Sequence, residues 1–323
     1  MRDALREAIR VTDDVTAELA SQLHAERGLD GTDPDADPAR YAATGAKHLR
    51  NHLPAAVLER LATWRGSTAP WLTVSGLPGP AEPVATPVTG FVDEARLTTV
   101  NLVHFGMLQL LRLAPVAYRW ENDGRLIRNV APRPDAGDTL TSWGYSAPLD
   151  WHTDDSVLDH RPGADPGHAI PACLSFVGLR NDERVPTGLL PVTEVLAGLP
   201  EEAVAGLRRP EFTITAPESY AATDDGHLTQ EGVPLLWTLP DGHAALRYGP
   251  GRATGRTTRA AGALAALEAR LAALTGTEVL IGAGDFHVFD NRRVLHRRVP
   301  FRPGAPGAAR WLRRVYAAPR QAG

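Results

Sequence analysis

The feature that most constrains the fold is a change in the pattern of the sequence near Ala114. From there to the C-terminus, short segments with strand-like composition alternate with turns rich in Gly and Pro. Many short strands at this density are typical of a β-sandwich or barrel. One strongly helical stretch, residues 257–275, interrupts them and is built from Ala, Leu, Glu and Arg. We therefore expect an α+β protein with a β-rich core over residues 114–323.

The N-terminal part, residues 1–113, is predicted to be mainly helical and to pack on that core within a single domain. Apolar residues at helical spacing predict an amphipathic helix over 2–27, a helix over 39–64 that is broken near Pro54, and a buried helix over 95–113. A short strand is expected at 71–74. The strands expected in the core span 115–121, 125–130, 139–146, 148–152, 172–179, 211–216, 234–238, 243–248, 277–281, 285–289, 293–298 and 310–318.

Composition excludes several classes of partner. The chain has 34 Lys and Arg against 38 Asp and Glu, a net charge of −4 without a long basic run, so neither nucleic acid nor a membrane surface is an expected partner. The single cysteine, Cys173, lies in an apolar run and indicates a buried thiol in a reducing compartment. No apolar leader or run of about 18 apolar residues is present, so we expect a soluble cytoplasmic protein.

A short polar segment, residues 149–155, contains His152 and Asp154 at the end of an expected strand. Residues two apart on a strand point to the same side of the sheet, so the imidazole and the carboxylate are predicted to lie together. The pattern alone is weak, because 11 His and 38 acidic residues in 323 positions give roughly one such pair by composition. A second pair, His24 and Glu26, lies on a charged helix and is interpreted as a solvated face.

A second segment, residues 284–298, places His296 on a separate strand. Two imidazoles and one carboxylate can occupy one face of an octahedral metal and leave three positions open, which is the ligand set of non-haem Fe(II) oxygenases. Alone, His296 would more often be a structural histidine. Arg310, 14 residues further on, reverses that balance because such an enzyme needs a cation for a dicarboxylate cosubstrate.

Arg310, Leu312 and Arg314 alternate on an expected strand, so the two arginines are predicted to face the same way. Two guanidinium groups inside one barrel are costly to desolvate unless anions meet them, and arginine forks suit carboxylates. This arrangement implies two carboxylates, one from the cosubstrate and one from the substrate. The alternative is that both arginines pair with acidic residues at the protein surface.

Several motifs together carry a family resemblance. The matching pieces are residues 123–127 with Val130 and Pro132, Ser142, residues 149–155, 179–182, 246–248, 289–296 with Phe301, and 310–312. The stretch from about Tyr118 to the C-terminus, roughly two-thirds of the chain, resembles the clavaminate synthase-like Fe(II)/2-oxoglutarate oxygenases, a group that includes hydroxylases of free amino acids.

The resemblance implies a double-stranded β-helix (jelly-roll) core flanked by helices. It implies Fe(II) held by three ligands, with 2-oxoglutarate and O₂ as cosubstrates. Arg310 would bind the distal carboxylate of 2-oxoglutarate and Thr187 would add a hydroxyl donor. The ligands implied for iron are His152, Asp154 and His296. The residues implied around the substrate are Glu121, Ser142 and Arg314, with Arg314 on the α-carboxylate and Glu121, from an early strand, on the α-ammonium.

The sequence departs from the family pattern at three places. Asp154 stands where a Glu ligand is usual, and Glu121 stands where relatives often carry Gln, which adds a negative charge suited to an amino group. After Arg247 and Tyr248 the chain continues Gly249-Pro250-Gly251-Arg252 without an acidic residue, which weakens the case for arginine or lysine as substrate. In addition to these three departures, residues 160–171 form a longer segment than the family's usual lid, and we expect residues 159–171 to be mobile without substrate.

The leading hypothesis is an Fe(II)/2-oxoglutarate-dependent oxygenase that hydroxylates an unactivated C–H bond of an amino acid or a derivative, with release of succinate and CO₂. The substrate is a small molecule, free or bound to a carrier protein. Desaturation or cyclisation remains open, whereas halogenation is disfavoured because Asp154 fills the place a halide would need. Two further alternatives are a zinc-dependent hydrolase on the same ligands and a non-catalytic jelly-roll binding module. Substrate identity and oligomeric state are left open.

Overall fold

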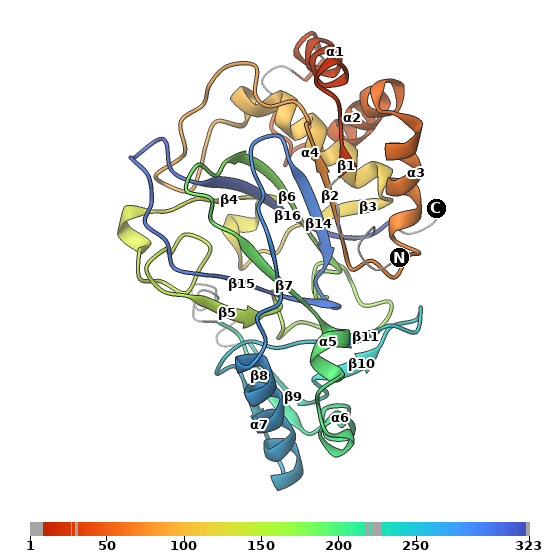
Figure 1. The fold of residues 1–323 in the computed structure, drawn as a ribbon, viewed down its shortest axis with the longest axis vertical. Helices are drawn as coiled ribbons and strands as arrows, with labels where there is room; N and C mark the ends of the chain where they lie inside the picture. The colour runs from red at the N-terminus through yellow and green to blue at the C-terminus, as the bar shows by residue number, and fades with distance from the viewer. Residues whose placement is uncertain (1–8, 27, 30–31, 218–219, 221–227, 321–323) are drawn as a thin grey trace.

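The computed structural model describes residues 9–26, 28–29, 32–217, 220 and 228–320. Two mainly antiparallel sheets form the centre of the molecule (Figure 1). The large sheet has the strand order β1-β2-β14-β6-β16-β3, with β4 also paired to β16. Only the β1–β2 pair within it is parallel. Its strands are β1 (Ile9–Arg10), β2 (Trp71–Ser75), β3 (Leu113–Val116), β4 (Ile127–Val130), β6 (Cys173–Arg180), β14 (Phe286–Asp290) and β16 (Trp311–Pro319).

The small sheet is entirely antiparallel and has the order β13-β7-β15-β5. It comprises β5 (Leu149–His152), β7 (Thr187–Pro191), β13 (Thr277–Val279) and β15 (Val294–Arg298). Figure 1 shows β7 and β15 of this sheet on one side of β6 and β16. The chain crosses between the two sheets several times, so strands that are distant in sequence become neighbours.

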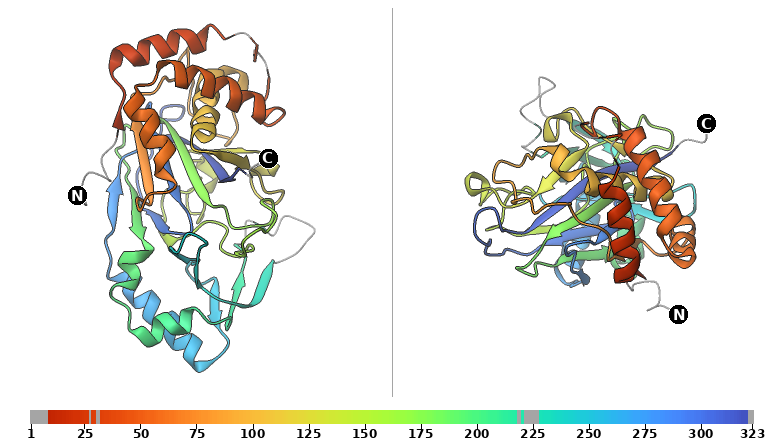
Figure 2. Two further views of the ribbon diagram at one scale, coloured as in Figure 1. Left: turned by 90° about the vertical axis from the view of Figure 1, so that its right-hand side faces the viewer. Right: turned by 90° about the horizontal axis from the view of Figure 1, so that it is seen from above.

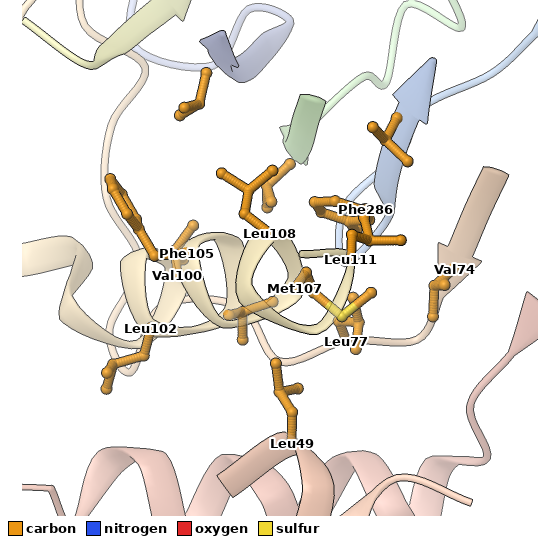
Figure 3. Close-up of a cluster of buried hydrophobic side chains, with 14 of the residues drawn as sticks. Leu49, Val74, Leu77, Val100, Leu102, Phe105, Met107, Leu108, Leu111 and Phe286 are labelled. Carbon is orange, nitrogen blue, oxygen red and sulfur yellow. The ribbon is translucent and has the colours of Figure 1, made fainter. Parts of the chain in front are cut away.

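N-terminal helices cover the outer face of the large sheet (Figures 1 and 2). They are α1 (Asp13–His24), α2 (Pro38–His52), α3 (Ala55–Trp64), the 3-10 helix η1 (Glu94–Leu97) and α4 (Thr98–Leu110). Helix α4 is buried along most of its length, and Leu49, Met107 and Phe286 lie in the apolar cluster between it, α2 and the sheet (Figure 3). A Cβ on Gly45 would lie 1.9 Å from the Leu102 carbonyl oxygen, so this glycine permits the close approach of α2 and α4.

The remaining elements extend from the small sheet. They are α5 (Val192–Leu196), α6 (Glu201–Leu207), a three-stranded sheet of β8 (Phe212–Thr215), β9 (Thr229–Val233) and β12 (Ala253–Gly255), a hairpin of β10 (Leu236–Thr238) and β11 (Ala244–Leu246), and α7 (Thr258–Ala272). The 3-10 helices η2 (Asn122–Gly124) and η3 (Pro134–Ala136) lie in the loops around β4. Among the described residues, no helix combines the length and apolar character needed to cross a membrane.

Most predicted elements are present, and three predictions are wrong. Residues 139–146 form turns and bends instead of a strand, because backbone bonds within the segment, such as Gly144 N to the Thr141 oxygen, close it on itself. The strand predicted over 115–121 ends at Val116, so Glu121 lies in a loop. The first helix, predicted over 2–27, begins only at Asp13 in the described part, since residues 9–10 pair with β2. The N-terminal part therefore supplies two strands to the large sheet.

Candidate active site

A cavity of about 280 Å³ lies between the two sheets. The large sheet contributes side chains of β4, β6 and β16 to its wall, and the small sheet contributes side chains of β5, β7 and β15. All eight residues that the sequence singled out line this one cavity: Glu121, Ser142, His152, Asp154, Thr187, His296, Arg310 and Arg314. Residues far apart in the sequence therefore meet at one place.

Three potential metal ligands lie close together in the wall of the cavity. His152 ends β5 and is the antiparallel register partner of His296 on β15, so the two imidazoles lie side by side with ring centroids 4.1 Å apart. Oδ1 of Asp154 is 3.3 Å from Nε2 of His152 and 3.4 Å from Nε2 of His296. The candidate ligand atoms all lie within 4.8 Å of one another, a spacing compatible with one shared ion.

Neighbouring groups orient these side chains. Nδ1 of His152 donates to the Asp150 carbonyl at 2.7 Å, which leaves Nε2 as the lone-pair nitrogen facing Asp154. The buried Asn291 side chain holds the Asp154 backbone, accepting from its N–H at 2.9 Å and donating to its carbonyl at 3.0 Å. Burial, and then the neighbouring His152, lowers the pKa of His296 to about 4. His296 is therefore neutral at pH 7, which is the form that binds metals.

The second carboxylate oxygen of Asp154 is held by the large sheet. Oδ2 accepts from Nη1 of Arg314 at 2.9 Å and from the Tyr316 hydroxyl at 2.8 Å. Burial would raise the pKa of Asp154, but Arg314 and the histidines outweigh it and hold the pKa well below its usual range. Asp154 thus stays ionised and presents one oxygen to the imidazoles. Two imidazoles and one carboxylate of this kind fit Fe(II) with open coordination positions.

One end of the cavity contains arginines that form no ion pair with the residues that the structure describes. Arg310, just before β16, is 4 % exposed, and its guanidinium donates no hydrogen bond to any residue that the structure describes. Burial, and then the neighbouring Arg298, lowers the pKa of Arg310 to about 10. Thr187, the buried first residue of β7, lines the same cavity. Arg298 donates to the carbonyls of Gly144 and Ala147.

The other end contains a compact group of charges. Oε1 of Glu121 accepts from Nη2 of Arg314 and, at 3.2 Å, from Nη1 of Arg128. Nε of Arg128 donates to the Ser142 hydroxyl at 2.5 Å. Because Arg314 and Glu121 contact each other directly, a ligand cannot lie between them unless they separate.

Sequence reasoning did not identify Arg128, Tyr316 or Asn291. Tyr316 continues the alternation of Leu312 and Arg314, so period two carried a signal for it. Arg128 and Asn291 carried no local signal, because their roles depend on which strands and loops are neighbours. Residues 159–171, predicted as a lid, do not line the cavity; their ends are tied by the bonds Asp159 N to His168 O and Ile170 N to Asp159 O. Their mobility stays a prediction.

The sequence is similar to known oxygenases. Residues 192–316 match the family model described as taurine catabolism dioxygenase TauD, TfdA family. The L-asparagine oxygenase of Streptomyces coelicolor is 28% identical over 315 residues, which cover 94% of this chain and 87% of that protein. The L-lysine 3-hydroxylase of Catenulispora acidiphila is 26% identical over 269 residues, which cover 82% of this chain and 72% of that protein.

Solved structures of oxygenases are also similar to this chain. Asparagine oxygenase in complex with Fe(II), 2S,3S-3-hydroxyasparagine and succinate has a TM-score of 0.75 and 25% identity, covering 96% of this chain and 93% of that chain. The non-heme iron oxygenase OrfP in complex with Fe and alpha-ketoglutaric acid has a TM-score of 0.77 and 23% identity, covering 98% and 94%, and supports the fold. The family match over residues 192–316 and these likenesses show that the chain is similar to Fe(II)/2-oxoglutarate-dependent oxygenases that act on amino acids, and the His-Asp-His group in the cavity fits the iron of such enzymes.

Proposed function

We propose that this dioxygenase hydroxylates an unactivated C–H bond of an amino acid or a close derivative, with release of succinate and CO₂. The observation that carries the proposal is the arrangement around one cavity: a His-Asp-His group, with Arg314 bound to Asp154 and Arg310 lining the same cavity four residues earlier in the chain. The named substrates of the relatives, asparagine, lysine and enduracididine, are all amino acids and support the same class.

His152, Asp154 and His296 are the proposed iron ligands. Bound iron, with 2-oxoglutarate and O₂, supplies the oxidising power for C–H cleavage. The protein keeps His296 neutral, keeps Asp154 ionised, and directs one oxygen of Asp154 toward the metal position by holding the other with Arg314 and Tyr316. We further propose that the two sheets form the two sides of a jelly roll, with residues 1–113 packed on it in one catalytic domain.

Arg310 and Thr187 are the proposed partners of the distal carboxylate of 2-oxoglutarate. A bidentate guanidinium–carboxylate pair would supply the anion that the buried Arg310 lacks in the described structure. At the other end, Arg314, Glu121 and Ser142 are the proposed contacts of the substrate headgroup. This division gives each carboxylate its own arginine and directs the substrate's side chain toward the metal.

A screen tests the proposal. Free L-amino acids, nonproteinogenic ones included, are incubated with the Fe(II)-loaded protein, 2-oxoglutarate and O₂, and succinate release is measured together with the mass of the product. We expect at least one amino acid to stimulate succinate release with the gain of one oxygen atom. A product lacking two hydrogens would indicate desaturation or cyclisation instead. Zinc-dependent hydrolysis without 2-oxoglutarate consumption would contradict the proposal. In that mechanism Arg310 would have no cosubstrate carboxylate to bind.

A further inference from the structure

We infer that Arg128 is a substrate-binding residue that completes a two-arginine subsite with Arg314, and that this subsite selects a substrate with a free carboxylate over a carrier-bound thioester or an amide. The inference rests on the proposed function and deepens it. In this assignment Glu121 acts as the counter-ion that holds the two arginines together.

The pairing of strands β4 and β16 brings the two arginines together. Arg128 and Arg314 are direct register partners across these antiparallel strands, both side chains line the cavity, and each residue is only 8 % exposed. Like charges directly opposite each other on a sheet are destabilising, and burial makes the cost larger. A pair of buried arginines at this position therefore needs anions.

The protein supplies too little negative charge for the pair. A single carboxylate oxygen, Oε1 of Glu121, accepts from both guanidiniums. The other carboxylate on Arg314 is Asp154, which belongs to the proposed metal ligands and whose charge the metal shares. Asp155 also lines the cavity, but its carboxyl accepts from the Tyr220 hydroxyl, and burial raises its pKa well above the usual range, which disfavours its charged form. With Glu121 as the carboxylate that contacts both, the two guanidiniums have an excess of one positive charge, which matches one carboxylate of a ligand.

Arg128 is held in a fixed orientation. Its Nε donates to the Ser142 hydroxyl at 2.5 Å, and its guanidinium lies over the Trp143 ring at 4.2 Å from the centroid. A guanidinium that is already oriented loses little side-chain entropy when a carboxylate binds. A thioester or amide carbonyl at the same place carries no charge, so it would leave the excess cation buried without a partner.

Arg128→Gln is the central test, and Arg133→Gln is its matched control. Arg133 also lies over the Trp143 ring, at 4.4 Å, but it pairs with Asp135 and does not line the cavity. Binding is measured by calorimetry on the Fe(II)-loaded protein with 2-oxoglutarate and without O₂. The probes are free L-amino acids and the matching α-carboxamides, which keep the shape and lose the charge.

We expect free amino acids to bind the unmodified protein at least about tenfold more tightly than their carboxamides, the scale of one desolvated charge pair. Arg128→Gln should remove most of that difference by weakening the free acids, with the affinity for 2-oxoglutarate changed less than about twofold. Arg133→Gln should leave the difference in place. Equal binding of acids and carboxamides to the unmodified protein, or equal weakening of both by Arg128→Gln, would overturn the inference.

A double variant separates substrate binding from a purely structural role. The reference is Glu121→Gln alone, because Glu121 is itself a proposed contact of the headgroup. If Arg128 served only to neutralise Glu121, the double variant Arg128→Gln with Glu121→Gln would bind free amino acids as well as Glu121→Gln does. We expect the double variant to bind them more weakly than Glu121→Gln, and equal affinity would overturn the inference. Binding of neither acids nor carboxamides to the unmodified protein would mean that the proposed function itself fails, and the inference with it.

Discussion

The two ends of the cavity hold their arginines in opposite ways. At one end Arg310 and Arg298 have no ion pair within the described residues, and burial lowers the pKa of each to about 10. At the other end Glu121 lies between Arg128 and Arg314. There, burial would lower the pKa of Arg314, but Glu121 and the neighbouring acidic groups raise it well above its usual value.

The difference matches what each end is proposed to bind. A buried cation without a counter-ion is unfavourable for the fold, and proteins tolerate such groups mainly where function requires them. In the proposed function every turnover brings a 2-oxoglutarate carboxylate to Arg310, so the cosubstrate supplies the counter-ion at that end. The substrate end keeps a carboxylate of its own, Glu121, because two arginines meet there. Removal of the arginine should therefore reduce ligand affinity more at the cosubstrate end than at the substrate end.

Removal of a proposed metal ligand should lower turnover the most, because the reactions of both the cosubstrate and the substrate depend on the metal. His296→Ala is expected to lower succinate production by more than the 10- to 100-fold that loss of an outer partner of a metal ligand costs. The protein-bound iron, measured by metal analysis, should fall with it. His24→Ala is the control, since His24 belongs to the other His-x-acid pattern and is exposed on α1. Normal iron content and turnover in His296→Ala would contradict the site.

Arg310→Ala should have the next largest effect and should affect one end only. Loss of one partner of a desolvated charge pair costs about 2–5 kcal/mol, so the KM for 2-oxoglutarate should rise roughly 30-fold or more. Arg310→Lys keeps the charge and loses the fork, and it should recover part of the loss. Steady-state kinetics with varied 2-oxoglutarate measures both variants. An unchanged KM for 2-oxoglutarate would mean that Arg310 has another role.

Arg314→Ala should have a smaller effect at the other end, because Arg128 remains to meet the carboxylate. We expect the affinity for the amino-acid substrate to fall by more than about tenfold, while the affinity for 2-oxoglutarate barely changes. Titration of each ligand against the same variant separates the two. Intact substrate affinity would contradict the α-amino-acid assignment and leave the oxygenase assignment unaffected.

The smallest effect concerns two buried histidines outside the cavity. His104 on α4 and His287 on β14 are fully buried, and burial lowers the pKa of each to about 3. Because this folded-state value lies below the unfolded value of about 6.5, the unfolded chain binds more protons between these pH values. The free energy of unfolding should therefore fall as pH falls below about 6.5, by up to about 1.4 kcal/mol per pH unit for each histidine.

Urea denaturation at pH 7.5 and 5.5 measures this loss. His287→Gln should reduce the difference between the free energies of unfolding at the two pH values. The Thr73 hydroxyl lies 2.8 Å from Nδ1 of His287, so the Gln side chain of the variant would remain near this hydroxyl. A free energy of unfolding that does not change between these pH values would show that the buried histidines are not the acid-sensitive groups.

Local pattern predicted the parts of the site that lie close together in sequence. His152 and Asp154 are two residues apart, and Arg310 and Arg314 are four residues apart, so period two was enough to align each pair. The same rule could not identify Arg128, because its place depends on the pairing of β4 with β16 across the whole C-terminal half. Charge reasoning predicted that two inward arginines need two anions. It did not reveal that Glu121 is already one of them.

The fold, like the site, could be predicted from the sequence only in part. Apolar periodicity located α2, α3, α4 and α7, and β-branched runs located most strands. Strand β7 escaped because its five residues, Thr187–Pro191, include Gly188 and end in proline, which mark turns when read locally. Residues 139–146 were wrongly predicted as a strand, because their Thr and aromatic residues are common in strands. In the structure their backbone hydrogen bonds close turns. Sheet order lay beyond local pattern altogether.

A crystal structure of the Fe(II)-loaded protein with 2-oxoglutarate, grown without O₂, tests the comparison of the two ends most directly. We predict that the distal carboxylate forms two hydrogen bonds of about 2.7–2.9 Å with the Arg310 guanidinium. We also predict that Glu121 still bridges Arg128 and Arg314. A distal carboxylate bound between Arg128 and Arg314, with Arg310 left without an anion, would contradict the proposed roles of the two ends.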